Sequence, residues 1–207
     1  MLRLSWIVLV TALSAQELKP LNVDIAKVEF KGRTAWKVTP KGPGDQETMA
    51  FIQGVDFENG TIELELAGAP GAGAGEGARG FAGVAFRVRP EGKTYECFYL
   101  RPTNGRADDQ VRRNHSAQYI SHPDYPWQRL RKETPEKYES YVDLEPAVWT
   151  KVRIEVSGSK ALLFVHGSQQ PTLIVNDLKL GPCRGGIALW IGPGTEAHFA
   201  NLTVKTK

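Results

Sequence analysis

The feature that most constrains the fold is a strict alternation of apolar and polar side chains in residues 61–66, written Thr-Ile-Glu-Leu-Glu-Leu. Ile and Leu share one face and Thr and Glu the other, which is the period of a β-strand with one buried and one wet face. After residue 16, no segment combines helical periodicity with capping residues. The sequence therefore predicts an all-β protein.

Further strand segments are short, and they are separated by Gly, Pro, Asn and Asp. Asn59-Gly60 is a turn signal of the hairpin kind, and residues 89–92 predict a second hairpin turn. Strands are expected at residues 28–39, 48–53, 61–66, 81–88, 95–101, 110–120, 141–144, 149–156, 161–166, 173–175, 186–191 and 197–204. Short strands at this spacing are typical of a two-sheet antiparallel β-sandwich of the jelly-roll kind.

The 207 residues are enough for one domain with a substantial core, predicted over residues 20–207. The formal net charge is only +3, and Lys and Arg are scattered among acids. Nucleic-acid binding is not expected, because it needs a concentrated basic face. The glycine-rich residues 68–80 lack the Gly-Lys-Ser/Thr of a phosphate-binding loop and predict a surface loop.

Residues 1–16 have the parts of a secretory signal peptide. Arg3 precedes the apolar run 4–13, and the small residues Ser14-Ala15 follow it. The prediction is a secreted or periplasmic protein, with a buried N-terminal helix as the alternative. The apolar run is too short for stable membrane insertion. Cys97 and Cys183 form either a disulfide or two separate thiols, and the sequence leaves both open.

Residues 93–131 depart from ordinary strand sequence, because Tyr, Trp, His, Arg, Asn, Asp and Gln crowd together there. Aromatic faces beside rigid hydrogen-bonding groups suit a ligand with many hydroxyls, such as a glycan or small saccharide. Alternation allows only some of them to face one cleft. The predicted ligand-binding residues are Tyr99, Arg101, Arg112, Asn114, His115, Gln118, Tyr119, His122, Tyr125 and Trp127.

No metal or other cofactor is expected. His115 and His122 with Asp124 lack the ligand number and spacing of a zinc site. Calcium stays an alternative, because Asp108 and Asp109 near Asn104 offer oxygen ligands, although turn chemistry explains these residues equally well.

The last third of the chain carries a family resemblance. Residues 149–156 open a strand with Trp149, a hairpin follows, and Phe199-Ala200-Asn201-Leu202-Thr203-Val204 resembles a closing Phe-x-Asn-Leu/Ile-x-Val strand. The segment resembles the concanavalin A-like lectin/glucanase superfamily, and especially the secreted bacterial 3-keto-disaccharide hydrolase-like domains. The resemblance implies a concanavalin A-like jelly roll whose concave sheet binds or processes glycans.

By position, the resemblance implies that Glu96 is the catalytic acid, if the protein is an enzyme at all. The Glu-x-Asp-x-Glu strand of the superfamily's retaining glucanases is not present. Glu63 and Glu65 have the spacing of one strand face, but a solvated sheet face explains them. Three functions stay open: a carbohydrate-binding or lectin-like domain, a glycoside-cleaving enzyme using Glu96 with Asp108, Asp109 or Asp124, and a protein-interaction sandwich.

Overall fold

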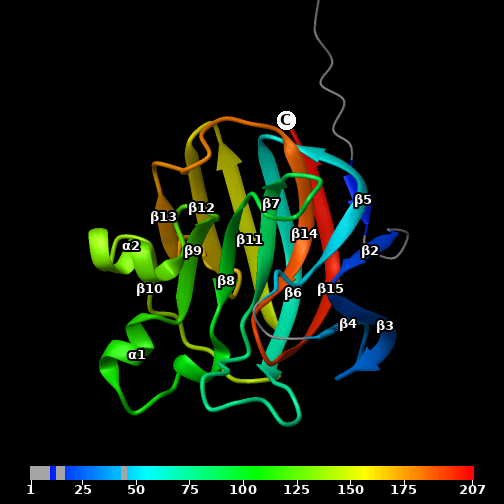
Figure 1. Ribbon diagram of the computed structural model, residues 1–207, viewed down its shortest axis with the longest axis vertical. Helices are drawn as coiled ribbons and strands as arrows, with labels where there is room; N and C mark the ends of the chain where they lie inside the picture. The colour runs from blue at the N-terminus through cyan, green and yellow to red at the C-terminus, as the bar shows by residue number, and fades with distance from the viewer. Residues whose placement is uncertain (1–9, 13–16, 43–45) are drawn as a thin grey trace, which may run out of the picture.

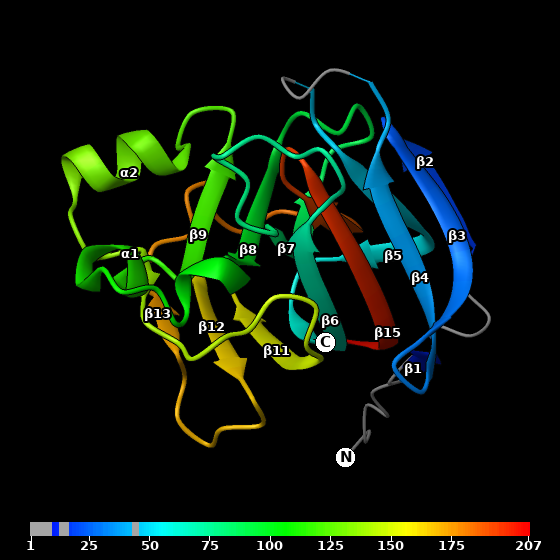
Figure 2. The same cartoon turned by 90° about the horizontal axis from the view of Figure 1, so that it is seen from below.

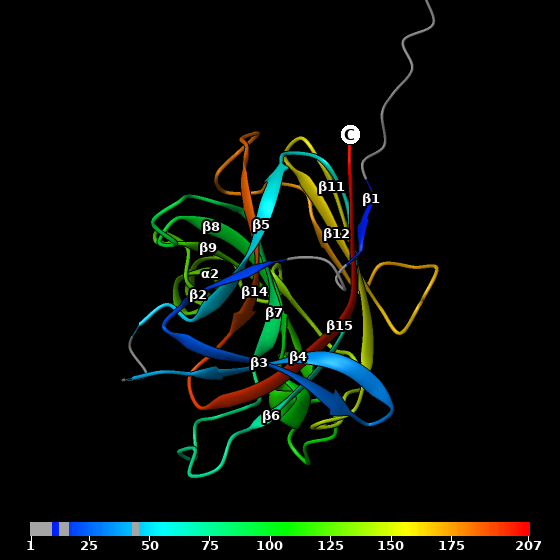
Figure 3. The same cartoon turned by 90° about the vertical axis from the view of Figure 1, so that its right-hand side faces the viewer.

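The computed structural model describes residues 10–12, 17–42 and 46–207, which form two antiparallel sheets packed face to face (Figures 1 and 3). The first sheet has the order β13-β12-β11-β6-β15-β4-β3, with β1 beside β15, and the second has the order β10-β9-β8-β7-β14-β5-β2. The all-β sandwich predicted from the sequence is confirmed.

The strands of the first sheet are β1 (Val10–Ala12), β3 (Val23–Phe30), β4 (Arg33–Pro40), β6 (Gly60–Pro70), β11 (Thr150–Ser157), β12 (Lys160–Val165), β13 (Leu173–Val175) and β15 (Thr195–Thr206). Those of the second sheet are β2 (Leu18–Leu21), β5 (Met49–Phe57), β7 (Ala82–Val88), β8 (Tyr95–Leu100), β9 (Ala117–His122), β10 (Glu139–Ser140) and β14 (Gly185–Ile191). The short helices are η2 (Pro102–Asn104), α1 (Gln110–Asn114) and α2 (Trp127–Glu133), and α1 and α2 lie at one side of the second sheet (Figure 1).

The alternation in residues 61–66 places apolar side chains in the core. Ile62 and Leu64 of β6 are buried and stand opposite Ile154 and Val152 of β11. From the other sheet, Phe57, Phe86 and Phe98 fill the same core. Burying a side chain of this size stabilises the fold by about 1.5–3 kcal/mol, so the two inner faces hold the sheets together.

The two predicted hairpin turns have different outcomes. Residues 89–92 do form a hairpin turn, in which the Gly92 N–H donates to the Arg89 carbonyl at 2.9 Å. The hairpin expected at Asn59-Gly60 is wrong, because this turn carries the chain from β5 in one sheet to β6 in the other. Gly60 has φ +141°, and a Cβ there would lie 2.0 Å from the Lys205 carbonyl oxygen, so the crossing requires glycine.

Three sequence predictions of local structure need correction. Residues 110–114 are helix α1 rather than strand, because the Asp109 carboxylate accepts the Arg112 N–H at 2.6 Å and caps the turn. The expectation of no helix after residue 16 also fails at α2 (Trp127–Glu133), which begins directly after Pro126 and packs against the core through the buried Leu130. Residues 141–144 are irregular rather than a strand.

The predicted signal peptide lies almost wholly outside the described residues. Of residues 1–16, only Val10–Ala12 is described, as β1 paired with β15. No helix in the described part of the chain has the length and apolar character needed to cross a membrane.

Cys97 and Cys183 are both free thiols in the structure, so the disulfide alternative is not observed. Cys97 is buried on β8, whereas Cys183 is half-buried in the segment before β14.

Candidate ligand-binding site

A cavity of about 820 Å³ opens beside the end of β8, between the loop before β7 and helices α1 and α2. Figure 2 shows both helices at the same edge of the second sheet, near β9. We call this cavity the arginine cleft. It is lined by Gly77, Arg79, Phe81, Arg101, Asn104, Asp109, Val111, Arg112, His115, Trp127 and Arg131.

Arg101 directly follows β8, and it is fixed from several sides. Its side chain donates to the Tyr99 hydroxyl at 2.8 Å, to Gln118 Oε1 at 3.0 Å and to the His115 carbonyl at 2.9 Å. Its guanidinium carbon also lies 5.7 Å from the centre of the Trp127 ring. Arg101 is therefore a rigid part of the cleft wall, exposed by only 5%.

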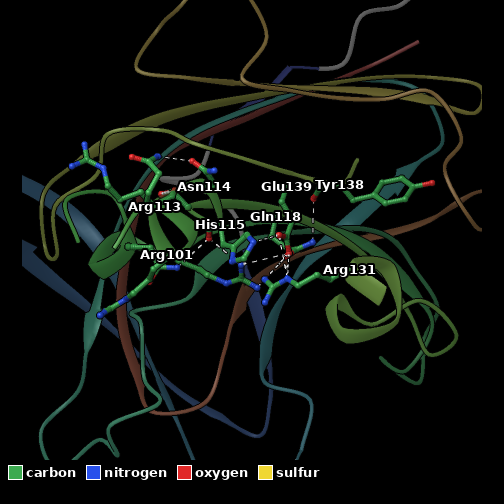
Figure 4. Close-up of polar contacts among 12 residues, drawn as sticks. Arg101, Arg113, Asn114, His115, Gln118, Arg131, Tyr138 and Glu139 are labelled. Carbon is green, nitrogen blue, oxygen red and sulfur yellow. Dashed lines mark hydrogen bonds and ion pairs between the residues drawn. The ribbon is translucent and has the colours of Figure 1, made fainter. Parts of the chain in front are cut away.

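Glu139 is the buried carboxylate behind this wall. Arg131 donates to Glu139 Oε1 from Nη2 at 2.6 Å, and His115 Nε2 lies 2.9 Å from Oε2. Figure 4 shows Arg101, His115 and Arg131 gathered around Glu139. Burial lowers the pKa of His115, although Glu139 opposes this effect, so the imidazole is neutral at pH 7.

Trp127 supplies the exposed aromatic surface of the cleft. It is the first residue of α2 and is 37% exposed, while Leu130 one turn later is buried and anchors the helix. The Arg131 guanidinium carbon lies 4.6 Å from the Trp127 ring centre and holds the indole from one side. The indole is therefore positioned before any ligand arrives.

Arg112 and Arg79 come from segments far apart in the sequence. Arg112 Nε donates to Asn104 Oδ1 at 3.0 Å, and its Nη2 donates to Thr103 Oγ1 at 3.3 Å. Arg79 donates to the backbone carbonyls of Ala78, at 3.0 Å, and Glu76. Burial, together with the charges of Arg112 and Arg101, lowers the pKa of Arg79.

The structure brings six of the predicted ligand-binding residues together. Arg101, Arg112, His115 and Trp127 line the arginine cleft. Tyr99 and Gln118 lie behind it and hold the Arg101 guanidinium. These six residues lie in or directly after β8, α1, β9 and α2. The polar segment of residues 93–131 therefore folds around one cavity.

Glu96 and Tyr119 lie elsewhere, between the two sheets. Glu96 is fully buried, and its carboxylate accepts the Tyr119 hydroxyl at 2.5 Å and the Leu180 N–H at 2.8 Å. Burial raises the pKa of Glu96, against the opposing effect of these hydrogen bonds. This position does not bring the Glu96 carboxylate to the cleft.

His122, Tyr125 and Asn114 are also outside the cleft. The His122 ring stacks on Tyr95 at 4.9 Å, and its Nδ1 lies 3.1 Å from a Glu47 oxygen. Tyr125 lies under the Arg129 guanidinium, whose carbon is 4.4 Å from the ring centre. Asn114 accepts a hydrogen bond from Gln110 on α1, and Figure 4 shows it pointing away from Glu139.

Several residues of the site were not expected from the sequence, among them Arg79, Phe81, Arg131 and Glu139. Arg79 and Phe81 belong to or follow the glycine-rich segment that was interpreted as surface loop, yet both line the cleft. Arg131, which lines the cleft, forms an ion pair with the buried Glu139 behind it. One sequence signal could have indicated Arg79 and Phe81: a charged and an aromatic side chain follow a segment made mostly of Gly and Ala.

No group of three metal-binding side chains occurs among the described residues. His115 and His122, the pair considered for zinc, face different carboxylates, Glu139 and Glu47. Asp109, considered for calcium, uses a carboxylate oxygen to cap α1.

Comparisons with known proteins show which solved structures have a similar fold. No family model matches the sequence, and no curated protein does. The fold is similar to that of the carbohydrate-binding module CBM66 from Bacillus subtilis, with a TM-score of 0.62 and 12% identity over 91% of this chain and 95% of that one. A Bacillus subtilis protein of unknown function with a galectin-like fold gives 0.54 and 9% identity, over 94% and 90%. Bacillus licheniformis β-glucanase gives 0.51 and 12% identity, over 90% and 82%. The chain thus has the concanavalin A-like jelly-roll fold that its sequence resembles.

Proposed function

We propose that this protein is a secreted carbohydrate-binding domain, and that its glycan lies in the arginine cleft. The observation that carries the proposal is the exposed indole of Trp127, which lines an 820 Å³ cavity together with arginines held in place by hydrogen bonds. The C–H face of a sugar stacks on an aromatic ring, and its hydroxyls require fixed donors and acceptors.

Two further observations support this proposal. A cavity of this size falls within the range of about 300–1,000 Å³ typical of small-ligand sites. The structurally similar CBM66 is a carbohydrate-binding module by name, although the shared fold alone does not assign a ligand. Secretion is part of the proposal because residues 1–16 have the composition of a signal peptide.

The carboxylates favour binding over glycoside cleavage. A retaining enzyme needs two carboxyl groups about 5–5.5 Å apart across the scissile bond. In this cleft Asp109 caps α1, and Glu139 is saturated by Arg131 and His115. Glu96, the acid implied by the family resemblance, lies in the core. The cavity also favours a small ligand over the flat patch that a protein-interaction sandwich would present.

A glycan array followed by calorimetric titration tests the proposal. Trp127→Ala should weaken binding of an array hit by about thirtyfold, since truncating a well-placed aromatic anchor costs about 2 kcal/mol. Trp127→Phe keeps an aromatic face and should recover part of the affinity. Ile174→Ala, an exposed apolar residue of β13, is the control and should bind like the wild type. Unchanged affinity in Trp127→Ala, or no array hit with folded protein, would reject the proposal.

A further inference from the structure

The arginine cleft carries an excess of positive charge. Its lining includes four guanidinium groups, those of Arg79, Arg101, Arg112 and Arg131. Two carboxylates lie at the cleft, Asp109 in the lining and Glu139 behind it. Four positive charges against two negative ones leave two in excess, with His115 neutral at pH 7. The whole chain carries only +3, so this excess is local.

The excess charge is concentrated on two of the four arginines. Glu139 faces Arg131 at 2.6 Å and Arg101 at 4.0 Å. The guanidiniums of Arg112 and Arg79, by contrast, have only neutral partners among the described residues: Asn104 and Thr103 for Arg112, and backbone carbonyls for Arg79. Asp109 accepts the backbone N–H of Arg112 and forms no ion pair with its side chain in the described structure.

Holding like charges at one cavity costs free energy in the absence of a compensating anion. The pKa of Arg79 is lowered by burial and also by the positive charges of Arg112 and Arg101, so part of this lowering reflects the repulsion between the arginines. Guanidiniums held by neutral partners keep further N–H donors for a ligand, and their planar geometry matches a carboxylate or a sulfate ester.

We infer that the glycan bound in this cleft is acidic, and that Arg79 and Arg112 bind its carboxylate or sulfate groups. This inference rests on the proposed function and names the class of sugar. Trp127 and Phe81 provide the apolar faces for the sugar rings, and the two arginines provide the charge complement. The four arginines gather around one local cleft, whereas a nucleic-acid strand needs an extended basic groove, so the cleft suits a short oligosaccharide better.

Titration calorimetry with matched oligosaccharides tests the inference. The probes are trigalacturonate, the same trisaccharide with its carboxyl groups reduced to alcohols, a sulfated galactan oligosaccharide of the same length, and a short single-stranded DNA. We expect at least one of the two acidic sugars to bind about tenfold or more tightly than the reduced trisaccharide, as one or two charge-assisted hydrogen bonds provide. The preferred acidic sugar distinguishes carboxylate from sulfate recognition.

Two variants locate the charge recognition. Arg79→Gln and Arg112→Gln should each weaken binding of the acidic sugar about tenfold, and each should weaken binding of the reduced trisaccharide by a clearly smaller factor, because a neutral hydrogen bond contributes less than a charge-assisted one. Arg184→Gln removes an exposed arginine that pairs with Asp56 and Glu58 and does not line the cleft, so it is the matched control. Circular dichroism and thermal melting verify that each variant is folded.

The outcomes separate this inference from the proposed function. Equal binding of the acidic and reduced sugars, or unchanged affinity in both arginine variants, would overturn the acidic class while leaving a glycan site in place. No binding of any sugar by folded protein would overturn both. DNA binding as tight as that of the acidic sugars would also overturn the inference, because the cleft would then recognise anions without regard to the sugar.

Discussion

Arg131 donates three hydrogen bonds to the Glu139 carboxylate: Nη2 and Nε reach Oε1 at 2.6 and 3.0 Å, and Nε also reaches Oε2 at 3.3 Å. The pair joins the end of α2 to β10, and through His115 and Arg101 it connects both to the rest of the cleft. Glu139 is exposed by only 8%, so its charge is compensated almost wholly by these neighbours.

Glu139→Gln should destabilise the fold by about 2 kcal/mol, because it leaves two arginines facing one another without the buried carboxylate. Urea denaturation measures the loss. The control is Glu133→Gln, which breaks the exposed pair of Arg129 and Glu133 within α2 and should cost about 0.5 kcal/mol or less. Equal losses in the two variants would show that burial adds nothing to the Glu139 interaction.

Glu96→Gln should change the pH dependence of stability rather than ligand binding. Burial raises the pKa of Glu96 in the folded state above its ordinary value of 4.5. Between these two pKa values the folded protein binds more protons than the unfolded chain, so the Glu96 contribution to stability falls as pH rises through this window. It is fully present below pH 4.5.

The variant has no titrating group at this position, and glutamine keeps an acceptor for the Leu180 N–H. The difference in unfolding free energy between wild type and Glu96→Gln should therefore change between pH 4 and 8, by up to about 1.4 kcal/mol per pH unit. If the difference in unfolding free energy does not change with pH, the raised pKa of Glu96 is contradicted. If Glu96→Gln binds the glycan more weakly than the wild type, Glu96 belongs to the candidate site.

Most of the sandwich was predictable because a strand repeats its pattern every two residues. The alternation through Ile62 and Leu64 determines which face is buried without any long-range information. Helix α1 was missed for the opposite reason: it has five residues, too few for a helical period, and it depends on one hydrogen bond that the Asp109 carboxylate accepts from the Arg112 N–H. Strand pairing was not predictable either, since the turn at Asn59-Gly60 looks the same whether the chain stays in a sheet or crosses between sheets.

The candidate site was only partly predictable, because residue type and residue position carry different information. Arg101, His115 and Trp127 stand out as polar or aromatic residues where a sheet would have Val or Ile, and they do line the cleft. Glu96 and Tyr119 have the same character, yet they satisfy each other inside the core. The sequence alone does not distinguish a polar residue that faces a ligand from one that faces another polar residue.

Arg87 stabilises the opposite end of the sandwich, and its loss is the largest single effect on stability that we expect. The side chain is fully buried and donates to three backbone carbonyls, those of Glu58 at 2.8 Å, Gly158 at 2.7 Å and Gly181 at 2.7 Å. These carbonyls belong to the β5–β6 and β11–β12 turns and to the segment before β14, so one guanidinium connects both sheets.

Arg87→Met keeps much of the volume but leaves the carbonyls without their donors, and it should lower the unfolding free energy by about 3 kcal/mol or more. Urea denaturation measures the loss. Arg89→Met, which replaces an exposed arginine in the next turn, is the control. If Arg87→Met loses no more stability than Arg89→Met, water replaces the guanidinium as the donor to these carbonyls.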